Sequence, residues 1–118
     1  MKQAVMKKWV KALRSGKYKK TTEALTRHGR YCCLGVLCEL AIKEGIPVEK
    51  RKVQFRTGSH SYDEKEGTLP KRVKKWAGIK RGNPYLRNMA CTLTEANDEL
   101  RYPFEKIADI IEAQWRGM

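Results

Sequence analysis

Hydrophobic residues recur at helical spacing near both ends of the chain. Residues 2–15 carry an apolar side chain every three or four positions, which predicts a helix with one buried face. That face consists of Val5, Trp9, Ala12 and Leu13. A second helix of this kind begins at Pro103, and its buried face is predicted to hold Phe104, Ile107, Ala108, Ile111 and Trp115.

The most apolar stretch of the sequence lies between these two helices. Residues 33–44 are hydrophobic on nearly every face, which predicts a helix buried at the centre of the fold. Gly45 and Pro47 are expected to end this helix. Gly35 lies inside it, where glycine costs roughly 1 kcal/mol relative to alanine, and this indicates that another element approaches closely there.

Shorter patterns predict the remaining elements. The sequence favours a helical turn at 21–25, a hairpin formed by 53–55 and 61–62, a short helix after Pro70, a strand at 89–93 and a polar turn around Asn97-Asp98 at 94–100. The tryptophans, Trp9, Trp76 and Trp115, fall at inward-facing helical positions and are expected in the core, with a subunit contact as the alternative for Trp115. We therefore predict a helix-dominated α+β fold: a single domain of residues 1–118 with a central buried helix at about 33–44, three packing helices and a small β-hairpin.

Positive charge is concentrated in two blocks of a chain whose net charge is +13. Residues 1–30 hold ten Lys and Arg against one acidic residue, and residues 48–87 hold twelve against four. Residues 88–118 reverse the balance, with three basic and six acidic residues. Basic blocks attract polyanions or anionic surfaces, and the alternative is that the charge only keeps the surface solvated.

Candidate ligand-binding residues follow from these blocks. One basic row runs along the first helix into a loop that holds Tyr18, and a second runs from the helix after Pro70 to the surroundings of Tyr85. Such charges suit phosphate groups, and interleaved aromatic rings can stack on the bases of single strands. The candidates are Lys7, Lys11, Arg14, Lys17, Lys20, Arg72, Lys74, Lys75, Arg81 and Arg87. The sequence contains no named nucleic-acid motif and no glycine-rich phosphate loop.

Adjacent cysteines at the start of the central helix suggest a second kind of chemistry. A thiol at a helix N-terminus has its pKa lowered by the helix dipole, which is how papain-like hydrolases activate their nucleophile. The candidates are Cys32 or Cys33 as nucleophile, His28 or His60 as base, and Asn97 or Asp98 as the orienting group. The competing interpretation is that the thiols are small hydrophobic core residues, and on balance no catalytic residue is favoured.

The cysteine spacing does not indicate a metal centre. Cys32, Cys33, Cys38 and Cys91 include no Cys-x-x-Cys pair, and adjacent cysteines rarely bind one zinc ion well. We therefore expect neither a metal nor a cofactor. No window of 18 apolar residues occurs, so no membrane partner is expected, and reduced thiols in a cytosolic protein are the default.

Segments along nearly the whole chain carry a family resemblance. They are residues 9–18, residues 29–40 with the run Cys-Cys-Leu-Gly-Val-Leu-Cys, Leu69-Pro70, Val73, Trp76-Ala77-Gly78, Asn83-Pro84, Asn97-Asp98 and residues 104–112. In order and spacing they resemble a widespread group of small, mostly uncharacterised bacteriophage and prophage proteins. The resemblance implies an accessory protein in the cytoplasm of an infected bacterial host, and it implies no particular activity. Proteins of this group are usually neutral or acidic, so the net charge of +13 distinguishes this chain from them.

Three functions follow as hypotheses. The first is a non-catalytic accessory protein, for host takeover or anti-defence, that binds a polyanion such as nucleic acid or a nucleotide signal through its basic blocks. The second is a protein inhibitor of a host defence enzyme, and the third is a papain-like thiol hydrolase. Whether the chain is an enzyme stays open, with a non-catalytic role favoured, and the sequence does not indicate an oligomeric state.

Overall fold

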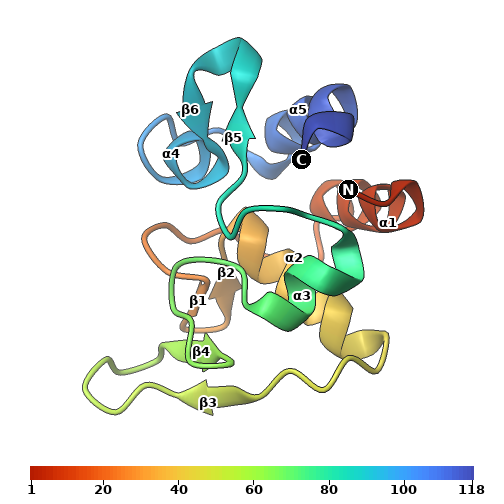
Figure 1. Cartoon of the computed structure of the whole chain (residues 1–118). Coiled ribbons are helices and arrows are strands. Elements are labelled where there is room, and N and C mark those ends of the chain that lie inside the picture. Colours follow the sequence, from red (N-terminus) through yellow and green to blue (C-terminus); the bar gives the residue numbers. More distant parts are fainter.

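Helix α2, Cys33–Lys43, lies at the centre of the fold (Figure 1). The structure is a computed structural model that describes residues 1–118. α2 contacts α1 (Gln3–Arg14), α3 (Lys71–Ala77) and α4 (Leu93–Asp98), while α5 (Phe104–Gln114) packs on α1 and α4. The predicted helix-dominated α+β fold is confirmed, although four further helices, not three, pack around the centre. No helix has both the length and the hydrophobicity that crossing a bilayer requires.

Three small antiparallel sheets of two strands each complete the fold. Their pairs are β1 (Thr26–Arg27) with β2 (Arg30–Tyr31), β3 (Lys50–Lys52) with β4 (His60–Tyr62), and β5 (Tyr85–Leu86) with β6 (Cys91–Thr92). Two 3₁₀ segments, η1 (Arg87–Met89) and η2 (Trp115–Gly117), follow β5 and α5.

The predicted hairpin exists with a different first strand. Lys50 pairs with Tyr62 and Lys52 with His60, so residues 53–55 lie in the connection instead of in the strand. Phe55, which suggested the strand, is 90% exposed. All side chains of the observed strand β3 are exposed, so its sequence lacks the alternation of apolar and polar residues that predicts a strand.

The core is assembled on both sides of α2. Trp9 of α1 is fully buried, and its indole N–H donates a hydrogen bond to the carbonyl of Cys33 at 2.9 Å. Val36 and Leu37 are also fully buried, and each such side chain contributes about 1.5–3 kcal/mol by leaving water. Trp76 and Trp115 are only half-buried at the edge of this core, which corrects the expectation that all three tryptophans are core residues.

The segment between α1 and α2 crosses α2 at Gly35. The backbone carbonyl of Leu25 lies against the Cα of Gly35, which confirms the predicted close approach. The Leu25 N–H donates to the Glu66 carbonyl at 2.8 Å, and its carbonyl accepts from the Cys32 N–H at 3.1 Å. Residues 22–25 form bends here, not the helical turn that the sequence favoured at 21–25.

Helix α4 replaces the predicted polar turn at 94–100. Thr92 caps it: the Thr92 hydroxyl accepts from the Glu95 N–H, and the Glu95 carboxylate accepts from the Thr92 N–H. The buried face of this short helix consists of Leu93, Ala96 and Asn97. The predicted strand at 89–93 is correspondingly shortened to the two residues of β6.

The β3–β4 hairpin is anchored to α2 by a buried tyrosine. Tyr62 is fully buried, and its hydroxyl donates to the Glu39 carboxylate at 2.6 Å. Lys50 donates to the same carboxylate oxygen at 2.9 Å. Burial, together with this hydrogen bond to Glu39, raises the pKa of Tyr62.

Candidate functional site

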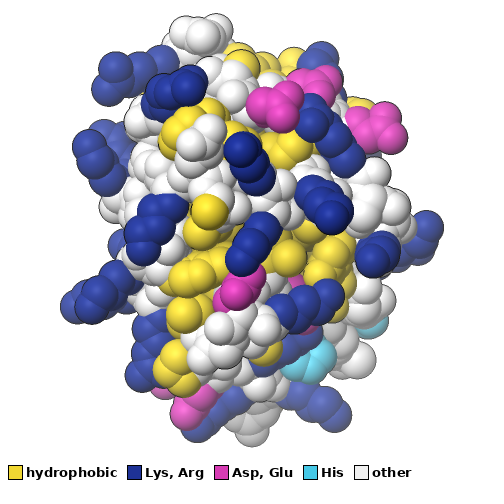
Figure 2. Space-filling view, turned by 90° about the vertical axis from the view of Figure 1, so that its right-hand side faces the viewer, with side chains coloured by type: hydrophobic (Ala, Val, Ile, Leu, Met, Phe, Trp, Pro, Cys, Tyr) yellow, Lys and Arg dark blue, Asp and Glu magenta, His cyan; other side chains and the backbone are white.

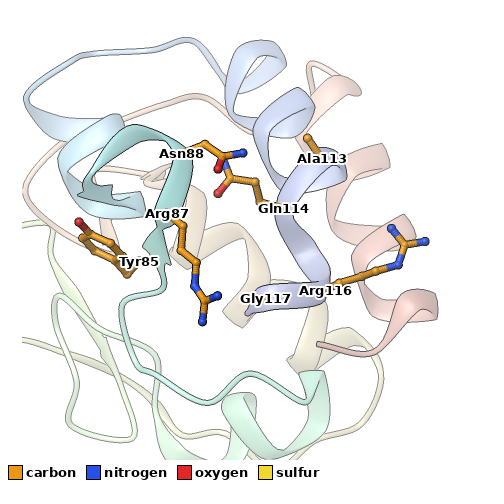
Figure 3. Close-up of a pocket in the computed structure, with 7 residues that line it drawn as sticks. All are labelled: Tyr85, Arg87, Asn88, Ala113, Gln114, Arg116 and Gly117. Carbon is orange, nitrogen blue, oxygen red and sulfur yellow. The ribbon is translucent and has the colours of Figure 1, made fainter.

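Two adjoining pockets lie between β5 and the C-terminal segment η2. The first has a volume of about 220 Å³ and is lined by Tyr85, Arg87, Asn88, Ala113, Gln114, Arg116 and Gly117 (Figure 3). The second has a volume of about 280 Å³ and is lined by Lys80, Arg81, Pro84, Tyr85, Arg87, Gly117 and Met118. The two pockets share Tyr85, Arg87 and Gly117, so they form one continuous surface, here named the β5 surface.

Local structure points the side chains of this surface outward. Leu86 is fully buried, and because side chains alternate along a strand, its neighbour Tyr85 projects to the other side. Arg87 begins η1 and is exposed. The Lys80 N–H donates to the Met118 carbonyl at 3.0 Å, which holds the loop after α3 against the C-terminal segment. The Asn83 side chain donates to the Thr94 hydroxyl at 2.6 Å and accepts from the Thr94 N–H at 3.2 Å, fixing the loop to α4.

The β5 surface carries cationic groups without acidic partners. Lys80, Arg81, Arg87 and Arg116 are exposed, and the salt bridges of the structure include none of them. No acidic residue lines either pocket. The uncompensated charge therefore makes this surface strongly attractive to anions.

Figure 3 shows how the side chains are arranged. Arg87 extends into the space between β5 and η2, while Asn88 and Gln114 lie together at the opposite end of the pocket. The Arg116 guanidinium lies on the other side of η2, where it stacks 4.6 Å from the centre of the Trp115 ring. The Tyr85 side chain is 45% exposed beside this pocket.

These groups match the chemistry of nucleic-acid strands. The arginine fork binds phosphate oxygens through two parallel hydrogen bonds, which a lysine cannot do. An exposed tyrosine ring offers a stacking face for a base, and side-chain amides such as those of Asn88 and Gln114 both donate and accept hydrogen bonds. The β5 surface thus holds cationic, aromatic and amide side chains within one small area.

Two candidates of the first basic block are engaged within the protein. Arg14 forms ion pairs with Asp109 at 2.6 Å and Glu112 at 3.2 Å on α5, and the hydrogen bonds to these carboxylates raise its pKa. The Lys20 ammonium donates to the Asn97 carbonyl at 2.6 Å, and burial lowers its pKa. Lys7, Lys11 and Lys17 remain exposed without an ion pair.

The candidates on α3 do not belong to the β5 surface. Arg72 donates to the Pro47 carbonyl and lies 3.9 Å from the Asp63 carboxylate. Arg72 and Lys75 line a separate hollow of about 520 Å³ beside Trp76. Lys74 lies on the same helix and lines neither pocket of the β5 surface. The structure thus divides the predicted ligand-binding residues among separate hollows. Arg81 and Arg87 meet on the β5 surface beside Lys80, and Arg72 meets Lys75 on α3. The others that share a hollow, on the α1 side, are Lys7, Lys11, Arg14 and Lys17.

The cysteines at the start of α2 are packed inside the protein. Cys32 is the N-cap residue of α2, and its sulfur accepts from the Gly35 N–H at 3.4 Å. Cys32 is 3% exposed and Cys33 is fully buried. Burial outweighs the helix dipole, so the pKa of Cys32 is raised to about 11 and that of Cys33 is also raised well above its ordinary value. The expected lowering of a thiol pKa is wrong for both.

The partners proposed for a thiol nucleophile have other contacts. His60 pairs with Lys52 in the hairpin, and the His28 ring lies against Gly58. Asn97 does reach the cysteines, but its side-chain oxygen accepts from the Cys33 backbone N–H at 3.2 Å. Asp98 accepts from the Asn97 amide at 2.7 Å. No hydrogen bond joins a histidine to a cysteine, and no group of three or more His, Cys, Asp or Glu residues could hold a metal ion.

We predict that the thiols of Cys32 and Cys33 react with iodoacetamide only after unfolding. A pKa of about 11 for Cys32 leaves about a ten-thousandth of that thiol ionised at pH 7, and burial blocks access as well. Cys91, at 8% exposed, is the least buried cysteine and should react first. Mass-spectrometric mapping of labelled sites, with and without denaturant, measures the difference. Rapid labelling of native Cys32 or Cys33 would contradict this and revive the hydrolase hypothesis.

Sequence reasoning missed the C-terminal half of the β5 surface. Tyr85 and its basic neighbours were visible as a local cluster, but Arg116 and Gln114 lie about thirty residues further on, in the acidic quarter of the chain. Only the packing of α5 brings them to β5.

The comparisons with known proteins describe no ligand for this surface. A family described as "Domain of unknown function (DUF8296)" matches residues 1–115. No curated protein and no solved structure matches the chain.

Proposed function

This chain belongs to the DUF8296 family, a domain of unknown function, and we propose that it is a non-catalytic protein that binds single-stranded nucleic acid through the β5 surface. The observation that carries the proposal is the exposed Tyr85, which lines one hollow with Lys80, Arg81 and Arg87, three cations without an acidic partner. Phosphates bind the cations while a base stacks on the ring, which is how sequence-tolerant single-strand binding works.

The size of the surface supports a short stretch of strand. The two pockets share Tyr85 and Arg87, so a strand of a few nucleotides can run from one pocket to the other. A single-strand ligand fits better than a duplex because an unstacked base is needed to cover the tyrosine ring. A nucleotide signal presents the same phosphate and base chemistry and is a smaller ligand of the same kind.

The biological setting is part of the proposal. The sequence resembles small accessory proteins of bacteriophages, which act in the cytoplasm of an infected bacterium. Binding of a single strand or a nucleotide signal there would serve host takeover or escape from host defence. The buried thiols of Cys32 and Cys33 argue against the papain-like hydrolase, since neither is positioned or ionised as a nucleophile.

We expect the protein to bind a labelled oligothymidylate in a steeply salt-dependent way. With three phosphate contacts on a single strand, the affinity should fall by about 20-fold between about 50 and 200 mM salt. The double variant R81E/R87E should lose more than about tenfold in affinity at low salt and show a shallower salt dependence. Fluorescence anisotropy gives both quantities.

The control for this experiment is the double variant R30E/K52E. This variant changes the net charge by the same amount as R81E/R87E. Arg30 and Lys52 are exposed, and neither lines a pocket of the β5 surface. Y85L should weaken binding by about 1–3 kcal/mol, whereas Y85F should keep the stacking face and the affinity. If both double variants weaken binding equally, net charge alone is responsible and the β5 surface is not the site.

A further inference from the structure

A second basic surface differs in chemistry from the β5 surface. It is a groove between α1 and α2, with a volume of about 280 Å³, lined by Lys8, Lys11, Ala12, Ser15, Lys17, Tyr18, Leu40, Lys43 and Glu44. Figure 2 shows the side of the molecule where α1 lies: hydrophobic atoms gather near the middle, and Lys and Arg side chains surround them. We call this hollow the α1–α2 groove.

The floor of the α1–α2 groove is apolar, and its one aromatic ring is already engaged. Ala12 and Leu40 are half-buried and supply aliphatic surface. Tyr18 packs edge-to-face on Tyr31 at 5.5 Å between ring centres, and its hydroxyl accepts from the Lys43 ammonium at 3.0 Å. That hydrogen bond raises the pKa of Lys43. The ammonium also lies 5.4 Å from the Tyr18 ring centre, so this ring is not a free stacking platform for a base.

The rim of the groove is positively charged. Four lysines line it against a single acidic residue, Glu44, which is already paired with Lys8. Lys11 and Lys17 are exposed and take part in no salt bridge. A second hollow of about 450 Å³ continues from Lys11 and Ser15 across α1, and its one acidic residue, Glu112, is paired with Arg14. The face therefore offers positive charge with no acidic group left free.

We infer that the α1–α2 groove binds an acidic, amphipathic segment of a partner protein. An aliphatic side chain of the segment packs on Ala12 and Leu40, and its carboxylates lie against Lys11, Lys17 and Lys43. The aliphatic floor of the groove consists of Ala12 and Leu40 alone, so it receives one anchor side chain of a larger ligand. This is the helix-in-groove mode of recognition, with charge complementarity fixing the orientation.

The same features make nucleic acid the poorer occupant of this groove. Its one aromatic ring, Tyr18, is held by Tyr31 and Lys43, whereas the β5 surface presents the exposed Tyr85. An aliphatic floor offers a base no stacking partner. The inference does not rest on the proposed function, because the two surfaces share no residue.

The test uses a synthetic helical peptide of leucines at positions i, i+4 and i+7, with glutamates at most other positions. A control peptide replaces the leucines with serines and keeps the charge. We expect the leucine peptide to bind with a Kd of about 0.1–1 mM, to shift the methyl NMR signals of Leu40 and Ala12, and to bind at least about fivefold more tightly than the control. The double variant K11E/K17E should weaken binding at least about tenfold, and R81E/R87E should not change it.

Several outcomes would overturn the inference. Equal binding of both peptides, or binding without shifts at Leu40 and Ala12, would reduce the groove to a non-specific charged surface. Absence of binding at about 1 mM peptide would exclude it as a docking site of useful affinity. If oligothymidylate shifts the methyl signals of Leu40, and K11E/K17E weakens its binding, the groove binds nucleic acid instead. The R81E/R87E experiment tests the β5 surface independently of this result.

Discussion

Replacing Gly35 with alanine is expected to destabilise the native fold severely, although alanine is the better helix former by about 1 kcal/mol. A Cβ atom at Gly35 would lie 1.8 Å from the Leu25 carbonyl oxygen and 2.8 Å from its carbon. Both are backbone atoms, and hydrogen bonds to Glu66 and from Cys32 hold that backbone in place. Overpacking of this severity should cost more than about 3 kcal/mol, a large part of a total stability of about 5–15 kcal/mol.

A matched glycine separates this contact from a general effect of alanine. Gly67 has no atom within 4 Å of an added Cβ and has no positive φ angle, so G67A should change stability by less than about 0.5 kcal/mol. Urea unfolding followed by far-UV circular dichroism compares the two variants. A G35A protein as stable as the parent would mean that segment 17–31 does not cross α2 at this point.

Replacing Asn97 with alanine is expected to cost about 2–5 kcal/mol of stability, because it leaves buried backbone groups without partners. Asn97 is fully buried. Its side-chain oxygen accepts from the Cys33 N–H at 3.2 Å, and its amide donates to the Thr21 carbonyl at 3.0 Å and to Asp98 at 2.7 Å. One side chain thereby joins α2, α4 and the segment between α1 and α2.

The control for N97A is the exposed Asn88, whose side chain makes no hydrogen bond within the protein. N88A should stay within about 0.5 kcal/mol of the parent in the same urea titration. A loss below about 1 kcal/mol for N97A would show that water or local rearrangement replaces its hydrogen bonds, and that Asn97 is not a structural centre of the fold.

The long helices were predictable because their apolar residues repeat over several turns. The predicted helices at 2–15 and 33–44 correspond closely to α1, Gln3–Arg14, and α2, Cys33–Lys43. α4 was missed because its sequence is polar and short, and its core contribution comes from Leu93, Ala96 and an asparagine. The Thr92-x-x-Glu95 capping pattern was present in the sequence and could have indicated it.

The candidate site was only partly predictable because charge in a sequence does not reveal its partners. Arg14 looked equivalent to Arg87, yet folding places Arg14 against Asp109 and Glu112, while Arg87 meets no acid. Similarly, the position of Cys32 before α2 suggested a lowered pKa. Its burial, which depends on tertiary packing, raises the pKa instead.

The packing of α1 along α5 also decides when the fold can be completed (Figure 1). Arg14 and Asp109, which join the two helices, are 95 residues apart in the sequence. Contacts of such long range slow folding, because the intervening chain must be ordered before they form. During synthesis the apolar face of α1 therefore waits, without its α5 partner, until α5 has left the ribosome. α1 is the first of the five helices to be synthesised, and its partner α5 is the last.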